Sequence, residues 1–158
     1  MKFSDFVATE SIRPDVSATT KEGVIREMID ALAESGKIAK GEAESIVKAI
    51  LKREDLGSTG IGRGVAVPHT KHPSVSRLVG TVAVSRTGID FDSLDGDPVQ
   101  LFFLLVSPPD RPGDHLRALE NISRQLRDES FCSCLKSAAG ATDIQHLLEE
   151  ADSHGIVS

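Results

Sequence analysis

"VQLFFLLVS" (Val99–Ser107) is the most apolar segment of the chain, and the predicted architecture follows from it. Its apolar residues follow one another without the polar alternation of a half-exposed strand, a pattern typical of a strand covered on both faces. "LVGTVAVS" (Leu78–Ser85) alternates and is rich in β-branched residues, so it predicts a neighbouring strand. Shorter strands are expected at Val65–Val67 and Ile89–Phe91. A strand buried on both faces requires helices on both sides of its sheet.

Helical periodicity on both sides of these strands supplies the two covering layers. The first helix has a possible capping box at Thr19–Glu22, apolar residues at helical spacing up to Leu32, and a stop at Gly36. Further helices are expected at Lys40 to about Glu54, His115–Leu126, Phe131–Ala139 and Ala141–Ala151. We therefore predict an α/β fold, a three-layer α/β/α sandwich with a mixed parallel/antiparallel sheet, formed by residues 1–158 as one domain.

Composition narrows the class of protein. The formal net charge is −6, and six Phe with no Trp or Tyr leave few stacking platforms, so we expect no nucleic-acid partner. Cys132 and Cys134 are too few and too close for a disulfide scaffold, which favours free thiols. Neither a signal peptide nor an apolar run of about 20 residues is present, so we expect a cytoplasmic protein without membrane insertion.

The stretch "STGIGRGVAVPHTKH" (Ser58–His72) is dense in glycine and ends in two histidines. It lacks the Gly-Lys-Ser/Thr ending of a P-loop, and its order of helix, glycines and strand is the reverse of a dinucleotide fingerprint. Two interpretations stay open for the glycines. They form a tight connection that needs their backbone freedom, or they expose amides to a phosphate.

His69 follows Pro68, which fixes its own backbone, so the histidine is expected at the end of a short strand with little freedom. A structural histidine is one interpretation. The other is a nucleophile, because neutral imidazole offers a free lone pair near pH 7 and can attack phosphorus without a separate base.

A metal site is the rival interpretation of His69 and His72. Pro73 argues against a helical ligand pair, and no carboxylate or thiol lies close in sequence to complete a zinc site. The aspartates between Asp90 and Asp97 lack the spacing of an EF-hand and are typical of turns. We therefore expect neither a metal nor a cofactor.

"REDLGSTGIGRGVAVPHTK" (Arg53–Lys71) resembles the signature of the IIA components of the bacterial phosphoenolpyruvate-dependent phosphotransferase system. The resemblance is to the mannitol/fructose type, which includes the nitrogen-regulatory IIA proteins. It continues through "FDSLDGDPVQLFFLLVSPPD" and "HLRAL", from about Phe3 to about Glu150. The sequence departs from the usual pattern at Thr70 and Arg63, both near the expected docking surface.

The resemblance implies a set of site residues. His69 corresponds to the histidine that carries the phosphoryl group, His115 to a second histidine near the site, and Arg53 to an arginine beside the phosphoryl group. The loop amides and hydroxyls are expected to form a phosphate-binding loop of Ser58, Thr59, Gly60, Gly62 and Gly64. His69 itself is expected to be partly exposed on an apolar patch.

The resemblance also implies partners and a reaction. His69 is expected to accept a phosphoryl group from an upstream histidine phosphocarrier protein. Two destinations stay open: a nitrogen-type regulatory role through a target protein, or onward transfer to a IIB component during uptake of fructose or mannitol. Two alternatives of other classes are a IIA-like binding module without phosphotransfer and a metal-dependent hydrolase.

Overall fold

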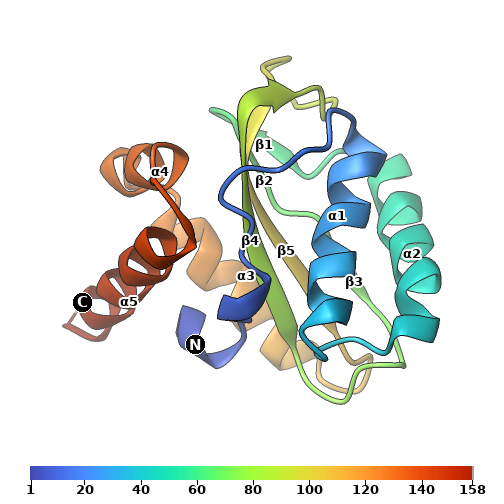
Figure 1. Ribbon diagram of the computed structural model, residues 1–158. Coiled ribbons are helices and arrows are strands. Elements are labelled where there is room, and N and C mark those ends of the chain that lie inside the picture. Colours follow the sequence, from blue (N-terminus) through green and yellow to red (C-terminus); the bar gives the residue numbers. More distant parts are fainter. Residues whose placement is uncertain (158) are drawn as a thin grey trace.

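A mixed sheet of five strands lies between two layers of helices in the computed structural model, which describes residues 1–157 (Figure 1). The helices are α1 (Lys21–Glu34), α2 (Ala43–Asp55), α3 (Pro112–Gln125), α4 (Glu129–Lys136) and α5 (Ala141–Val157). The strands are β1 (Gly60–Gly62), β2 (Val65–Ala66), β3 (His69–Lys71), β4 (Val79–Ile89) and β5 (Val99–Ser107). Short 3₁₀ turns cover Phe3–Asp5, Thr9–Ser11 and Lys40–Glu42.

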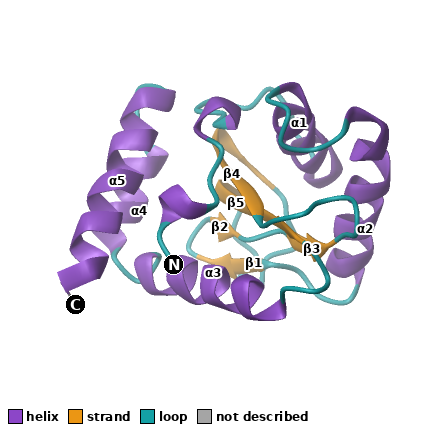
Figure 2. Ribbon diagram, turned by 90° about the horizontal axis from the view of Figure 1, so that it is seen from below, coloured by secondary structure: helices purple, strands orange, loops and turns teal. Residues whose placement is uncertain are grey.

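The helices divide between the two faces of the sheet. α1 and α2 cover one face, and α3, α4 and α5 lie on the other (Figure 1). Figure 2, seen from below, shows the same separation of α1 and α2 from α4 and α5. The predicted three-layer α/β/α sandwich is confirmed.

β5 is the centre of the sheet. It pairs antiparallel with β4 on one side and parallel with both β2 and β3 on the other, while β1 pairs antiparallel with β2. The mixed sheet predicted from the sequence is therefore present. Because β2 meets the first half of β5 and β3 meets the second half, the two short strands form one interrupted line along it.

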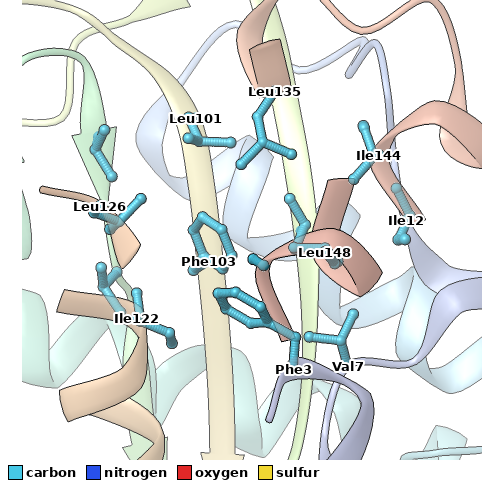
Figure 3. Close-up of a cluster of buried hydrophobic side chains, with 14 of the residues drawn as sticks. Phe3, Val7, Ile12, Leu101, Phe103, Ile122, Leu126, Leu135, Ile144 and Leu148 are labelled. Atoms are coloured by element: carbon cyan, nitrogen blue, oxygen red, sulfur yellow. The ribbon is translucent and has the colours of Figure 1, made fainter. Parts of the chain in front are cut away.

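Side chains of β5 alternate between two cores, as the period of a strand requires. Leu101, Phe103 and Leu105 point into the core under α3, α4 and α5, which also takes Phe3 from the first turn of the chain (Figure 3). Phe102, Leu104 and Val106 point into the core under α1 and α2. A strand that serves both cores must be apolar throughout, which explains the continuous run in its sequence.

The N-terminal segment covers the outer edge of β4. Val7 and Arg13 form parallel bridges with Gly80 and Ala83, and the N–H of Ala8 donates to the carbonyl of Gly80 at 2.8 Å. An exposed sheet edge offers unpaired backbone groups to other chains. This segment satisfies several of those groups.

Several expected boundaries are wrong. Thr20, not Thr19, caps α1 by accepting from the N–H of Gly23, so the residue three positions on is glycine and no capping box forms. α3 begins at Pro112 rather than His115, because proline suits the first helical turn. α4 begins at Glu129 after its cap Asp128. No separate strand forms at Ile89–Phe91: Ile89 is the last residue of β4, and the two residues after it lie outside the sheet.

Two expectations from composition can be compared with the described residues. Both cysteines are free thiols, Cys132 buried and Cys134 exposed, as predicted. Within residues 1–157, none of the helices combines the length and apolar character that a membrane crossing needs.

Candidate active site

The interruption between β2 and β3 determines the position of His69. Pro68 lies in the interruption, has no N–H to donate to a ladder, and accepts a hydrogen bond through its carbonyl from the N–H of Leu105 at 3.0 Å. His69 then opens β3 and pairs with Leu105. The sequence placed His69 at the end of a strand, whereas it begins one. Its side chain is half-buried beside the C-terminal half of β5.

One nitrogen of the His69 ring is engaged by the backbone. Nδ1 lies 2.7 Å from the carbonyl oxygen of Val67. A carbonyl only accepts, so Nδ1 carries the ring proton and, in the neutral ring, Nε2 keeps the lone pair. Burial lowers the pKa of His69 and outweighs the hydrogen bond to Val67, which raises it; the charge of Arg53 lowers the pKa further, and that of Glu54 raises it least. The ring is therefore neutral near pH 7.

His115 lies beside His69, with the two ring centroids 5.4 Å apart. It comes from the first turn of α3, is buried, and has its Nδ1 2.5 Å from the hydroxyl oxygen of Ser107 at the end of β5. Burial, and then the positive charges of His69 and Lys71, lower the pKa of His115 to about 4. This second imidazole is also neutral near pH 7.

Arg53 lies in the last turn of α2, the helix that packs against β3. Its Nη1 donates to the carbonyl of Gly57 at 3.0 Å, which satisfies a backbone acceptor just beyond the end of the helix. The guanidinium is close enough to His69 to lower the pKa of that ring. Arg53, His69 and His115, far apart in sequence, are thus brought together.

The first part of the glycine loop runs along Ala66 and Val67, just before His69, but its polar groups are largely engaged. The Thr59 N–H and hydroxyl both donate to the carboxylate of Glu54. The Ser58 hydroxyl donates to the carbonyl of Phe91 at 2.6 Å and accepts from the N–H of Gly60 at 3.0 Å. These contacts fix the loop against α2.

Gly62 and Gly64 lie at the far end of β2. They flank Arg63 in the turn of the β1–β2 hairpin, with φ of 99° and 77°, values that glycine adopts readily. Val65, next to Gly64, pairs with Leu101, whereas His69 pairs with Leu105. Four residues along a parallel strand span about 13 Å. The structure therefore does not bring this turn to the imidazoles.

The Arg63 turn is held by the acidic loop that follows β4. The Asp95 carboxylate accepts from the N–H of Arg63 and from the N–H of Asp97, both at 3.0 Å. These hydrogen bonds lower the pKa of Asp95. The aspartates of this loop thus bond to the backbone of turns.

His72 is close to His69 in sequence but differs in its contacts. It is buried, with Nε2 2.9 Å from the hydroxyl of Ser45 and Nδ1 2.6 Å from the hydroxyl of Ser74. Both ring nitrogens therefore have partners. Among the side chains that the structure describes, those of residues 1–153, no group of three or more His, Cys, Asp or Glu is arranged to hold a metal ion.

Sequence reasoning gave no role to Glu54 or Ser107. Ser107 ends the apolar run of β5, and Glu54 stands four residues after the buried Ile50 on the inner stripe of α2. An acidic residue at an apolar position of a helix is a signal for a paired buried charge. Glu54 could have been found in this way.

Residues 5–151 match the family described as "Phosphoenolpyruvate-dependent sugar phosphotransferase system, EIIA 2". The chain belongs to this EIIA family. The resemblance noted in the sequence is thereby confirmed, and the matched region contains Arg53, His69 and His115.

Individual relatives of this EIIA chain carry two kinds of name. A nitrogen regulatory protein of Bradyrhizobium diazoefficiens is 36% identical over 148 residues, which are 94% of this chain and 95% of that protein. A fructose-specific EIIA component of Haloferax volcanii is 33% identical over 147 residues, 93% of this chain and 94% of that protein. The crystal structure of the nitrogen regulatory protein IIA-Ntr from Neisseria meningitidis aligns with a TM-score of 0.83 at 27% identity, covering 92% of this chain and 98% of that one.

Proposed function

We propose that this EIIA chain is a phosphocarrier that accepts a phosphoryl group on Nε2 of His69 from a histidine phosphocarrier protein. The observation that carries the proposal is the bond from Nδ1 of His69 to the Val67 carbonyl at 2.7 Å. That bond holds the proton on one nitrogen and leaves the lone pair on the other. Family membership supports a phosphotransfer role for the chain.

The transfer step is a displacement at phosphorus. The lone pair of Nε2 forms a bond to the phosphorus of the donor's phosphohistidine while the donor's P–N bond breaks, and its electron pair returns to the donor ring. Such transfer passes through a loose transition state, so the protein mainly positions groups and stabilises charge. As the His69 ring becomes positive, the Nδ1–H bond to Val67 strengthens.

His115 is proposed as a neutral hydrogen-bond donor to the phosphoryl oxygens. If the buried Ser107 hydroxyl donates to Nδ1, the ring proton of His115 is on Nε2. Its depressed pKa keeps His115 uncharged at pH 7, so it does not repel the positive ring that His69 becomes on phosphorylation. Because the neutral His115 adds no positive charge beside the phosphoryl group, it also does not bind that group so tightly that transfer to the next protein is prevented.

Arg53 is proposed to supply the permanent positive charge. One nitrogen of its guanidinium holds the Gly57 carbonyl, which leaves the other donors of the planar fork for phosphoryl oxygens. Among the loop residues, Thr59 bonds to Val67 and Gly60 pairs with Ala66, so these two and Ser58 form the part of the loop nearer to His69 along the chain. The Gly62 and Gly64 amides lie in the distant turn, so the proposal gives them a role in shaping the hairpin.

Exposed apolar side chains adjoin the proposed site. Leu56, 84% exposed, follows α2 directly after the turn that carries Arg53, and Leu116, 60% exposed, follows His115. Apolar side chains exposed around a reacting group are typical of a protein docking surface. We propose that the upstream carrier, and the protein that later receives the phosphoryl group, dock here.

The test is phosphorylation with purified upstream carriers and radiolabelled phosphoenolpyruvate. We expect wild type to take up label and His69→Ala to take up less than about one thousandth as much in the same time, because the acceptor atom is absent. His146→Gln, a change at an exposed histidine of α5, is the matched control and should behave as wild type. Mass spectrometry then maps the phosphorylated residue. Label entering His69→Ala at the wild-type rate would disprove the assignment.

The destination of the phosphoryl group separates the two kinds of relative. Rapid transfer of label from the chain to a fructose-type IIB domain would support a sugar-uptake role. Retention of label, with phosphorylation-dependent binding of a target protein, would support a regulatory role like that named for the Bradyrhizobium relative. A folded wild-type chain that takes up no label would favour a binding module without phosphotransfer.

A further inference from the structure

Glu54 is a buried carboxylate in the last turn of α2, next to Arg53. Its side chain is only 2% exposed and lies 3.0 Å from the ammonium of Lys21 on α1. A buried carboxylate is costly unless it is paired and hydrogen-bonded, and the C-terminal end of a helix disfavours negative charge. Neither the stability of α2 nor burial of apolar surface explains a glutamate here.

The groups that donate to the Glu54 carboxylate show that it binds the start of the glycine loop. Besides Lys21, the N–H of Thr59 donates to one carboxylate oxygen at 3.1 Å, and the Thr59 hydroxyl donates to the other. Three donors from two separate segments thus converge on one carboxylate. Thr59 is the loop residue that Glu54 fixes most directly, because both its backbone and its side chain are bound.

A short chain of contacts leads from Thr59 to the proposed phosphoryl acceptor. The carbonyl of Thr59 accepts from the N–H of Val67 at 3.1 Å. The carbonyl of Val67 then accepts from Nδ1 of His69 at 2.7 Å. Each step is one hydrogen bond or one residue of backbone, so displacement of Thr59 moves the acceptor that keeps the proton on Nδ1.

We propose that Glu54 is a positioning residue for His69, which acts through Thr59 and Val67 to keep the ring proton on Nδ1 and the lone pair on Nε2. The kinetic part of this inference rests on the proposed function. The tautomer part concerns the unphosphorylated chain and can be tested by itself.

The negative charge of Glu54 offers a second, independent measurement of its effect on His69, through the pKa of that ring. The charges that shift the pKa of His69 are those of Arg53 and Glu54, both from α2. His115 from α3 lies beside the ring, and its own pKa is lowered by the charges of His69 and Lys71. Arg53 lowers the pKa of His69, whereas Glu54 raises it. Removing only the negative charge must therefore lower that pKa further. Loosening of the site has the opposite sign, because rehydration returns the ring toward its ordinary pKa of about 6.5.

The experiment compares Glu54→Gln and Thr59→Val with wild type by ¹⁵N NMR of the His69 ring in the full chain. Thr59→Ser, which keeps the hydroxyl, is the matched control. We expect Glu54→Gln to increase the Nε2–H tautomer and to lower the pKa of His69. Thr59→Val should increase the same tautomer to a lesser extent, and Thr59→Ser should match wild type. Phosphorylation of Glu54→Gln should slow about tenfold with the KM for the carrier within about twofold.

Two results would overturn the inference. One is an unchanged tautomer in both Glu54→Gln and Thr59→Val. The other is a His69 pKa that rises toward the ordinary value in both, which would make Glu54 a general support of the loop. Urea unfolding of each variant establishes that the compared chains are folded, and Thr59→Val tests the path even where Glu54→Gln is too unstable. If wild type takes up no label at all, the proposed function fails, while the NMR result still decides the inference.

Discussion

His69 and His72 stand three residues apart, yet their surroundings differ in the way that decides imidazole chemistry. His69 is half-buried, has one ring nitrogen on a carbonyl, and lies near Arg53 and a second imidazole. His72 is buried with both ring nitrogens on serine hydroxyls. The neutral ring of His69 keeps a lone pair directed away from its carbonyl partner. In the ring of His72, by contrast, both nitrogens are hydrogen-bonded, and neither is available to a substrate.

From this difference we infer that the reactivity of each histidine depends on how many of its ring nitrogens are hydrogen-bonded within the fold. A neutral imidazole has one donor and one acceptor. The backbone uses only the donor of His69, whereas Ser45 and Ser74 use both functions of His72. Variants of His115, His72 and Arg53 test this contrast between His69 and His72, and the expected change in free energy decreases in that order.

The neighbour of His69 gives the largest effect, through the pH dependence of stability. His115 titrates near its ordinary pKa of about 6.5 when unfolded and near 4 when folded, so the unfolded chain binds more protons between these values. Stability therefore falls as the pH falls through this window. Its share is at most roughly 3 kcal/mol. Urea unfolding at pH 7.0 and 4.5 should show a smaller loss for His115→Asn than for wild type.

His115→Asn keeps a polar atom within reach of Ser107, which makes the comparison a fair one. The lowered pKa of His69 acts in the same direction in both chains, so the difference reports the loss of His115 together with its interaction with His69. Equal losses in the two proteins would mean that the surroundings of His69 do not disfavour positive charge, and the contrast with His72 would weaken.

His72→Ala should separate stability from phosphotransfer. The change removes a buried ring and leaves two serine hydroxyls without their partner, so we expect the free energy of unfolding to fall by about 2 kcal/mol. Because neither nitrogen of His72 is free, uptake of label should stay within about twofold of wild type at a temperature where the variant is folded. A folded His72→Ala chain that takes up no label would break the comparison.

Arg53 gives the smallest of the three effects. Arg53→Met removes the charge-assisted donor that we propose for the phosphoryl group, so the rate of phosphorylation should fall about tenfold, corresponding to about 1.4 kcal/mol. Arg53→Lys keeps the charge but not the fork that serves Gly57 and the phosphoryl group together, so its rate should be intermediate. Initial rates with the purified carrier measure this. Equal rates for Arg53→Met and wild type would remove Arg53 from the site.

The layers of the fold could be predicted because each follows from a pattern within one segment. The uninterrupted apolar run of β5 required cover on both faces, and helical spacing supplied the covering elements. β1 and β3 could not be predicted in this way. Each has three residues, glycine-rich or polar, and becomes a strand only because distant partners in β2 and β5 lie alongside it.

The residues of the site also separate into those that could be predicted from one segment and those that depend on distant parts of the chain. Pro68 and His69 are neighbours, so a constrained histidine could be inferred locally, although it proved to open a strand rather than end one. The convergence of Arg53 and His115 on His69 depends on α2 packing against β3 and α3 packing against β5, and only resemblance to a family suggested it. The link from Glu54 to Thr59 had a local signal, whereas the direction of the Ser107 hydroxyl had none.

β5 contributes side chains to both cores and also contacts both imidazoles. Its Leu105 pairs with His69, and the hydroxyl of its last residue, Ser107, is hydrogen-bonded to His115. The backbone amides of this strand should exchange with solvent only when the whole protein opens, since no part of it belongs to one layer alone. The two imidazoles then share the rigidity of the most protected element. We therefore expect the docking partner that is proposed above, rather than the strands of this chain, to make most of the adjustments on binding.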